Sequence, residues 1–231
     1  MIKTIESLTH DFQGDLFIDI GANVGMWSAE MVGLYKRIIY VEPGTDAIQT
    51  GKHKIENLCR LKNIPFEDVI FLKNVCSDQA GKEFNLTASG GDTGNMSIFA
   101  EDLYGSSNVT MREDNVLSIT LDNLIQYVGE NDKKIFIKVD TEGADLDVLL
   151  GGFKFIEKFK PDIFVEAHYH MYFDEEKHQK VFDFLFEQGY ELTEYKMEGY
   201  RAQANRIFDG THNGLEMYDR HFQMTLLQPT E

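Results

Sequence analysis

Short apolar runs alternate with longer stretches of helical periodicity between residues 16 and 165. The runs are apolar at nearly every position, which is typical of parallel strands that are covered on both faces. Alternation of such strands with helices indicates βαβ units, so we expect an α/β fold with a mostly parallel, doubly wound sheet. The predicted strands are Leu16–Ile20, Ile38–Val41, Val69–Leu72, Ile135–Val139 and Ile163–Val165, with helices at about 24–35 and 45–61.

The pattern changes in the C-terminal third of the chain. A helix is expected at about 175–188, ahead of Gly189, a suitable C-cap residue. Strands are expected at 190–195 and 222–227, and we expect them to form an antiparallel pair at one edge of the sheet. We expect residues 1–231 to form a single domain. Its irregular insertions are expected at about 88–115, where the Gly-rich part 89–108 is a candidate lid, and at 197–220.

The composition narrows the partners that the chain is expected to bind. It has 22 Lys and Arg against 39 Asp and Glu, a formal charge of −17. A surface this acidic repels a phosphate backbone, so we expect no nucleic-acid partner. Cys59 and Cys76 are too few for a disulfide framework, which favours a reduced, cytoplasmic protein. The sequence has neither the apolar core of a signal peptide nor an apolar run that spans a bilayer, so no membrane association is expected.

The strongest local motif is the sequence DIGANVGMWS from Asp19 to Ser28, placed where the first strand ends and a helix begins. Small residues at such a junction let the backbone approach a ligand closely. Glu42 ends the next predicted strand, 17 residues after Gly25. An acidic residue at about this offset accepts hydrogen bonds from a ribose. The motif therefore predicts a nucleoside-containing cofactor.

Two classes of cofactor use this arrangement. Dinucleotide sites favour three glycines in the pattern G-x-G-x-x-G, and here Asn23 occupies the position of the middle glycine. Asp19, two positions before Gly21, suits the ammonium group of a methionine moiety better than a pyrophosphate. S-adenosylmethionine is therefore favoured over a nicotinamide cofactor. An ordinary glycine-containing turn with a solvated Glu42 is the structural alternative.

A second cluster follows the predicted strand at 135–139. Strand alternation places Lys138 and Asp140, and by extension Glu142, on one face. Ligands of open α/β sheets lie outside the carboxyl ends of the strands, so Asp140 and Glu142 are expected to flank the reaction space. Lys138 lies deeper and needs an anionic partner. The alternative is an internal Lys138–Asp140 pair followed by an acidic first turn that favours the helix dipole.

A third cluster, Glu166, His168 and His170, ends the strand predicted at 163–165. Histidine is the commonest general base, and His168 is the first candidate for that role. The spacing matches no recognised metal signature, so we expect no metal site, although imidazole and carboxylate groups are ordinary zinc ligands. Packing or surface histidines are the alternative, more so for His170.

Taken together, these motifs resemble the FkbM-type methyltransferases. The resemblance covers about Leu16 to His168, and Thr141 stands where that family usually has an apolar residue. The segments that carry it are Asp19–Gly25, Val41-Glu42-Pro43, Val75–Asp78 with Gly81, Ser118–Asp122, and Ile137–Asp145.

The resemblance implies a class I methyltransferase fold, S-adenosylmethionine as cofactor, and methyl transfer to a hydroxyl of a sugar or small natural product. Glu42 is expected to hold the ribose. The catalytic candidates are His168 first, then Asp140 or Glu142. A non-catalytic adenosylmethionine-binding module and a nicotinamide-dependent oxidoreductase are the alternatives, and the oligomeric state is open. The residues expected to bind the cofactor are Asp19, Gly21, Ala22, Asn23, Gly25, Glu42, Cys76, Ser77 and Asp140.

Overall fold

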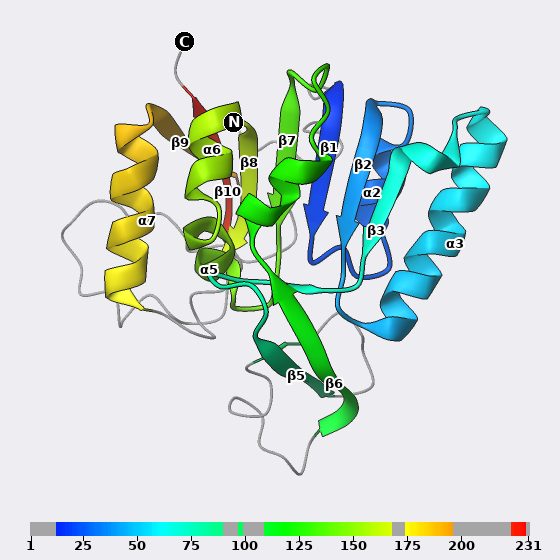
Figure 1. Cartoon of the computed structure of the whole chain (residues 1–231), viewed down its shortest axis with the longest axis horizontal. Helices are drawn as coiled ribbons and strands as arrows, with labels where there is room; N and C mark the ends of the chain where they lie inside the picture. Colours follow the sequence, from blue (N-terminus) through cyan, green and yellow to red (C-terminus); the bar gives the residue numbers. More distant parts are fainter. Residues whose placement is uncertain (1–12, 90–96, 99–108, 168–173, 196–222, 230–231) are drawn as a thin grey trace.

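The computed structural model describes residues 13–89, 97–98, 109–167, 174–195 and 223–229. In this part of the chain, seven strands form a main sheet in the order β3-β2-β1-β7-β8-β10-β9, and three form a smaller sheet in the order β4-β6-β5 (Figure 1). The main-sheet strands are β1 (Gly14–Ile20), β2 (Tyr35–Val41), β3 (Val69–Leu72), β7 (Ile135–Val139), β8 (Asp162–Ala167), β9 (Tyr190–Tyr195) and β10 (Gln223–Pro229).

The pairing directions confirm the predicted fold class. β1 pairs in parallel with both β2 and β7, and β3 and β8 extend the parallel part on either side. β10 is antiparallel to both β8 and β9, which confirms the antiparallel C-terminal edge. The strand order reverses at β1, so the carboxyl ends of β1 and β7 border the switch point at which doubly wound sheets bind ligands.

Helices cover both faces of the main sheet. The face that carries Leu16, Ile18 and Ile20 packs against α5 (Asp145–Leu150), α6 (Phe153–Phe159) and α7 (Glu175–Glu187). The face that carries Phe17 packs against α2 (Met26–Met31) and α3 (Thr45–Lys62). Alternate residues of β1 therefore enter two separate apolar clusters, which explains why its sequence is apolar throughout. None of the described helices combines the length and apolar character needed to cross a bilayer.

The helix predicted at 24–35 is shorter in the structure. It ends at Met31, and the chain turns through Gly33, whose φ of 90° is left-handed, before β2 begins at Tyr35. Tyr35 is buried against Phe17 and Phe136. Tyr35 is therefore buried as the first residue of β2. Its spacing from the preceding apolar residues also fits a helix, which is why the predicted helix extended to it.

The small sheet adds regular strands at the two ends of the stretch predicted as an irregular insertion at about 88–115. Strand β5 (Glu83–Ser89) and strand β6 (Val109–Ile119) occupy both ends of that range and pair in antiparallel fashion. Short β4 (Val75–Cys76) pairs with the end of β6, and β5 and β6 project beyond one end of the main sheet (Figure 1). Leu86 and Val116 pack with Val75 in a core of their own, which accounts for strand structure in this polar sequence.

The helix α3 contains a glycine that packing requires. Gly51 lies against the ring of Tyr40, and a Cβ there would lie 2.0 Å from the Tyr40 hydroxyl oxygen. We predict that Gly51→Ala lowers the free energy of unfolding by about 1–3 kcal/mol in chemical denaturation, because it overpacks this contact. In an unhindered helix the same change stabilises by about 0.5–1 kcal/mol. The control is Gln49→Ala on the exposed side of α3, expected within about 0.5 kcal/mol of the wild type. A stabilised Gly51→Ala protein would contradict the packing described.

Candidate functional site

A hollow opens at the carboxyl ends of β1, β2 and β7, at the switch point of the main sheet. Its walls combine the β1–α2 turn, the end of β2, the β7–α5 loop and the small sheet. The lining includes both polar and apolar side chains, as small-molecule sites usually do. The lining residues are Ile20, Gly21, Asn23, Val41, Glu42, Pro43, Asn74, Val75, Cys76, Leu86, Ile98, Asp140, Thr141, Glu142 and Ala144.

The β1–α2 turn is shaped by close contacts within the protein. Gly21 has a φ of 71°, and a Cβ on it would lie 1.7 Å from the carbonyl oxygen of Asp140. Asn23 is also left-handed, with a φ of 46°, and its carbonyl accepts a hydrogen bond from the buried hydroxyl of Tyr40. Gly21 therefore lets β1 and β7 approach each other. The close approach to a ligand that the small residues predict stays a prediction beside this packing role.

Glu42 lies where the sequence places it, at the end of β2 and in the wall of the hollow. Its side chain is buried, with Oε2 accepting from the backbone N–H of Asn23 at 2.8 Å and Oε1 from that of Gly44 at 2.8 Å. Burial raises the pKa of the carboxyl to about 7, although the two N–H donors act in the opposite direction. Glu42 is therefore a buried acceptor poised to ionise near neutral pH.

Several backbone N–H groups of the turn are already bonded within the protein. Those of Gly21 and Ala22 donate to Val41, and that of Gly25 donates to Ala22. The N–H and hydroxyl of Ser28, in the first turn of α2, both donate to Oδ2 of Asp19. A carboxylate of the protein therefore occupies the start of α2, where a dinucleotide-binding fold would present free donors to a pyrophosphate.

Lys138 joins the two central strands through its ammonium group. Its Nζ lies 2.9 Å from Oδ2 of Asp140, 2.9 Å from the carbonyl oxygen of Gly21 and 3.6 Å from Oδ1 of Asp19. Burial disfavours the charge, but the two carboxylates outweigh burial and raise the pKa of Lys138. Burial raises the pKa of Asp19 as well, against the effects of Lys138 and Ser28. The internal Lys138–Asp140 ion pair, which was the structural alternative for this cluster, is therefore present.

The β7–α5 loop carries the other predicted carboxylates. Strand β7 ends at Val139, so strand alternation holds for Lys138 and Asp140 but does not extend to Glu142. Glu142 has a left-handed φ of 53° and nevertheless lines the hollow, as Asp140 does. Asp145 closes the loop, because its Oδ1 accepts from the backbone N–H of Thr141 at 2.7 Å and from its hydroxyl at 2.8 Å.

The remaining predicted residues divide into two groups. Cys76 lines the hollow, and burial raises the pKa of its thiol to about 12. Asp19, Ala22, Gly25 and Ser77 do not line it, although Ser77 is the chain neighbour of Cys76 and donates its N–H to Ile119. His168 and His170 lie outside the described residues. In the described part of the chain, no group of three or more His, Cys, Asp or Glu residues is arranged to hold a metal ion.

Residues in and beside the small sheet reach the hollow or its walls although they were not predicted as site residues. Leu86 and Ile98 line the hollow, and Ser97, which is buried, contacts the β7–α5 loop. The stretch Met96–Phe99 stands out as an apolar interruption of a polar segment. That interruption was the available signal. The candidate lid at 89–108 includes Ser97 and Ile98, but the sequence does not show that Ser97 contacts the β7–α5 loop or that Ile98 lines the hollow.

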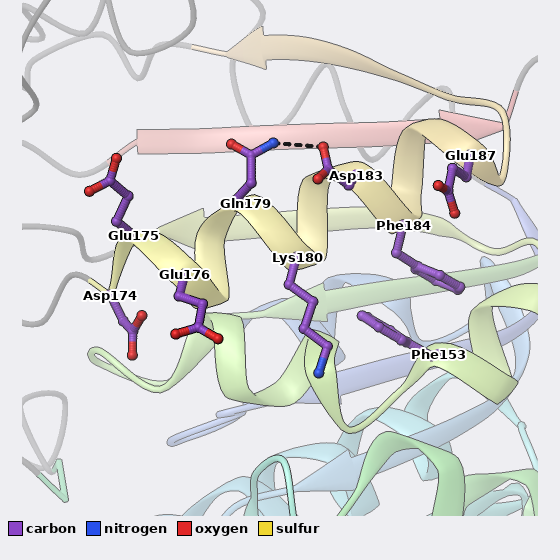
Figure 2. A pocket seen from close by; sticks show the side chains of 9 residues that line it. All are labelled: Phe153, Asp174, Glu175, Glu176, Gln179, Lys180, Asp183, Phe184 and Glu187. Atoms are coloured by element: carbon purple, nitrogen blue, oxygen red, sulfur yellow. Dashed lines mark hydrogen bonds between the residues drawn. The ribbon is translucent and has the colours of Figure 1, made fainter.

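A second, open hollow lies along α7, away from the strand ends (Figure 2). The rings of Phe153 and Phe184 stack at one end of it with their centroids 3.9 Å apart, and acidic side chains line α7. None of the predicted site residues borders it. We therefore place the functional site in the hollow at the switch point.

Comparisons with known proteins identify the fold and the family of the chain. The mostly parallel central sheet with helices on both faces is shared with solved structures of class I methyltransferases. The Methyltransferase FkbM domain profile matches residues 19–192, which is most of the chain. The chain belongs to the FkbM family of methyltransferases. No curated protein matches the chain by sequence similarity.

Solved structures share the fold at low sequence identity. Methyltransferase FkbM from Methylobacillus flagellatus KT is 14% identical with a TM-score of 0.55, and the match covers 93% of this chain and 43% of that one. The chain therefore spans less than half the length of that neighbour. An rRNA methylase from Streptococcus thermophilus is 11% identical with a TM-score of 0.51, covering 100% and 99%. A methyltransferase from Streptococcus mutans in complex with SAH is 14% identical with a TM-score of 0.50 and covers both chains fully.

The pKa of Glu42 makes a prediction for stability. The folded state holds its proton up to about pH 7, whereas a free carboxyl loses it near 4.5. Between these values the folded state binds more protons, so the free energy of unfolding falls as the pH rises from 4.5 through 7, by about 3 kcal/mol. We predict that Glu42→Gln flattens this slope in urea denaturation from pH 5 to 8.

Glu113 supplies the control for this experiment. Burial acts to raise its pKa, but hydrogen bonds from Lys73 and Thr45 outweigh burial and lower it. The contribution of Glu113 to stability is therefore lost only below its ordinary pKa, and Glu113→Gln is expected to keep the wild-type slope between pH 5 and 8. Equal slopes in the wild type and Glu42→Gln would contradict the raised pKa.

Proposed function

We propose that the protein transfers a methyl group from S-adenosylmethionine to a hydroxyl oxygen of a small molecule or carbohydrate. The observation that carries the proposal is the buried carboxylate of Glu42 in the wall of the hollow at the switch point. Both of its oxygens retain an unused lone pair for a ribose hydroxyl, since each accepts one backbone N–H. The family and the fold supply the methyltransferase chemistry.

The residues around the hollow suit the parts of this cofactor. We propose that Glu42 binds the ribose and that apolar Val41 and Cys76 pack against the adenine, with Ser77 next to Cys76 in the chain. The methionine end would then lie against the turn from Gly21 through Ala22 and Asn23 to Gly25, and near Asp140. Asp19 is buried behind that turn and is proposed to act indirectly, by fixing Ser28 and Lys138.

The turn argues against a nicotinamide dinucleotide. A pyrophosphate needs several free N–H donors at the start of a helix. Here those of Gly21, Ala22 and Ser28 are bonded to protein acceptors, and the carboxylate of Asp19 lies at the start of α2. Like charge and missing donors both disfavour a pyrophosphate, whereas a cationic methionine moiety meets neither obstacle.

Methyl transfer needs alignment and removal of a proton. When bound, S-adenosylmethionine supplies an electrophilic methyl carbon on a sulfonium, so the protein has to hold the acceptor oxygen in line with it. A base takes the proton of the acceptor hydroxyl, and we propose His168, directly after β8, for this role. Asp140 is already paired with Lys138, which favours the histidine as base. Glu142 is then proposed to position the acceptor.

The charge of the chain favours a small acceptor. A nucleic acid would have to approach a protein of net charge −17. The likeness to an rRNA methylase shows the shared fold and does not by itself assign the acceptor. The repulsion between an acidic surface and a phosphate backbone therefore decides our choice of a hydroxylated small molecule or carbohydrate.

The role of Glu42 predicts how cofactor affinity depends on pH. Ribose hydroxyls donate to the ionised carboxylate, so binding draws Glu42 into its charged form. With a pKa of about 7 in the free protein, affinity for S-adenosylhomocysteine is expected to rise from pH 6 to 8 and then level off. Glu42→Ala is expected to weaken binding by about 1–3 kcal/mol and remove this dependence. Isothermal titration calorimetry in buffers of different ionisation enthalpy measures both affinity and proton release. Wild-type affinity in Glu42→Ala would place the ribose elsewhere.

Turnover of a tritiated methyl group from S-adenosylmethionine tests the reaction itself. A panel of sugars, phenols and short RNAs is expected to yield labelled product with a hydroxylated small molecule and none with RNA.

If His168 is the base, His168→Ala lowers kcat by about 10²–10⁴ while leaving cofactor affinity intact, and wild-type activity rises with pH near the imidazole pKa of about 6.5. Glu142→Gln is expected to raise the acceptor KM with a smaller effect on kcat. Near wild-type kcat in His168→Ala would exclude the histidine as base, and labelling of RNA alone would overturn the proposed acceptor class.

A further inference from the structure

Glu142 holds an unfavourable backbone conformation in the wall of the hollow. Its φ of 53° is left-handed, a region that a residue with a Cβ rarely adopts, and the next residue, Gly143, has a φ of 113°. Such a conformation persists only when its surroundings fix it, and strained residues of this kind cluster at functional sites. The contacts of the Glu142 backbone therefore identify what holds this wall in place.

One such contact comes from a distant part of the chain. The hydroxyl of Ser97 donates to the backbone carbonyl of Glu142 at 2.6 Å, although the two residues are 45 positions apart. Ser97 is buried, with 1% of its surface exposed, and Glu142 is partly buried, so water has limited access to this hydrogen bond. A buried hydroxyl that loses its acceptor leaves a polar group unpaired, which makes the bond costly to break.

Ser97 is itself firmly attached to the small sheet. It forms a β-bridge with Thr87, in which each backbone N–H donates to the carbonyl of the other residue, at 3.0 and 2.9 Å. The next residue, Ile98, packs against Val75, Leu86 and Val116. The hydroxyl of Ser97 therefore fixes the β7–α5 loop relative to the small sheet.

The same contact joins two walls of the hollow. Leu86 and Ile98 line it from the side of the small sheet, and Asp140 and Glu142 line it from the β7–α5 loop. These two walls belong to different sheets, and the Ser97–Glu142 hydrogen bond ties them together. Loss of the bond would weaken the attachment between the two walls and the support of the left-handed conformation of Glu142.

We propose that Ser97 is a positioning residue for methyl transfer, which holds the small sheet and the Glu142 loop together around the bound cofactor. This inference rests on the proposed function, because it assumes that S-adenosylmethionine occupies the hollow. It adds a residue that none of the sequence motifs marks as part of the site. Since Ser97 acts through Glu142, its effect falls on retention of the cofactor and on alignment, and no bond is made or broken at its hydroxyl.

Dissociation of S-adenosylhomocysteine measures the proposed clamp directly. We expect Ser97→Ala to raise the dissociation rate constant about tenfold with little change in the association rate constant. Trp27, the single tryptophan, lies two residues after Gly25 and offers a stopped-flow fluorescence signal. Ser97→Thr keeps a hydroxyl and is expected to restore slow dissociation. Where turnover is measured, Ser97→Ala is expected to lower kcat through misalignment as well.

Ser118 is a matched control within the same sheet. Its buried hydroxyl also donates to a backbone carbonyl, that of Gln79, at 2.6 Å. Gln79 does not line the hollow, whereas Glu142, the acceptor of Ser97, does. Ser118→Ala is expected to reduce stability in urea denaturation about as much as Ser97→Ala does, with wild-type dissociation kinetics. Equal rates in Ser97→Ala and the wild type, equal acceleration in Ser118→Ala, or failure of Ser97→Thr to restore retention would overturn the inference while leaving the proposed function intact. A wild-type protein that does not bind S-adenosylhomocysteine would overturn both.

Discussion

The ammonium group of Lys138 lies between the carboxylates of Asp19 and Asp140 at the centre of the main sheet. It also binds the carbonyl of Gly21, so one buried cation connects the last residues of β1 to those of β7. A charge at this depth is stable only while its partners stay in place, and removing one partner of a buried pair costs about 3–5 kcal/mol. The β1–α2 turn, the start of the β7–α5 loop and the hollow between them all depend on this contact.

The main sheet could be predicted from the sequence because its strands are buried on both faces. Five apolar runs and the two late strands mark it, and the helices between the first strands indicate parallel βαβ connections. The small sheet could not be predicted in the same way. Strands β5 and β6 are polar over much of their length, and the few apolar side chains that hold them, Leu86 and Val116, carry too weak a pattern. The pairing of β5 with β6 depends on contacts between residues that are distant in the sequence.

The candidate site was predictable as far as strand ends determine it. Glu42 and Asp140 follow strands β2 and β7, and their convergence is a consequence of parallel strand direction. The sequence could not assign the contacts of the site residues that depend on tertiary packing. Asp19 binds Ser28 of α2, and the Cβ that Gly21 lacks leaves room for the carbonyl of Asp140. Ser97 reaches Glu142 from another sheet. Such contacts join residues whose separation along the chain follows no periodic pattern.

The separation of the buried charges along the chain has a consequence for folding. Lys138 and Gly21 are 117 positions apart, so the contact closes a long loop and forms only when β7 docks beside β1. Until then, neither Asp19 nor Lys138 has the ion pair that makes its burial tolerable, and the central strands stay hydrated at one end. During synthesis, the segment from β1 to β3 emerges first and lacks its contacts with β7 until β7 has been synthesised. The ligand-binding geometry is therefore completed in the same step that closes the main sheet, and a chain truncated before residue 135 lacks both.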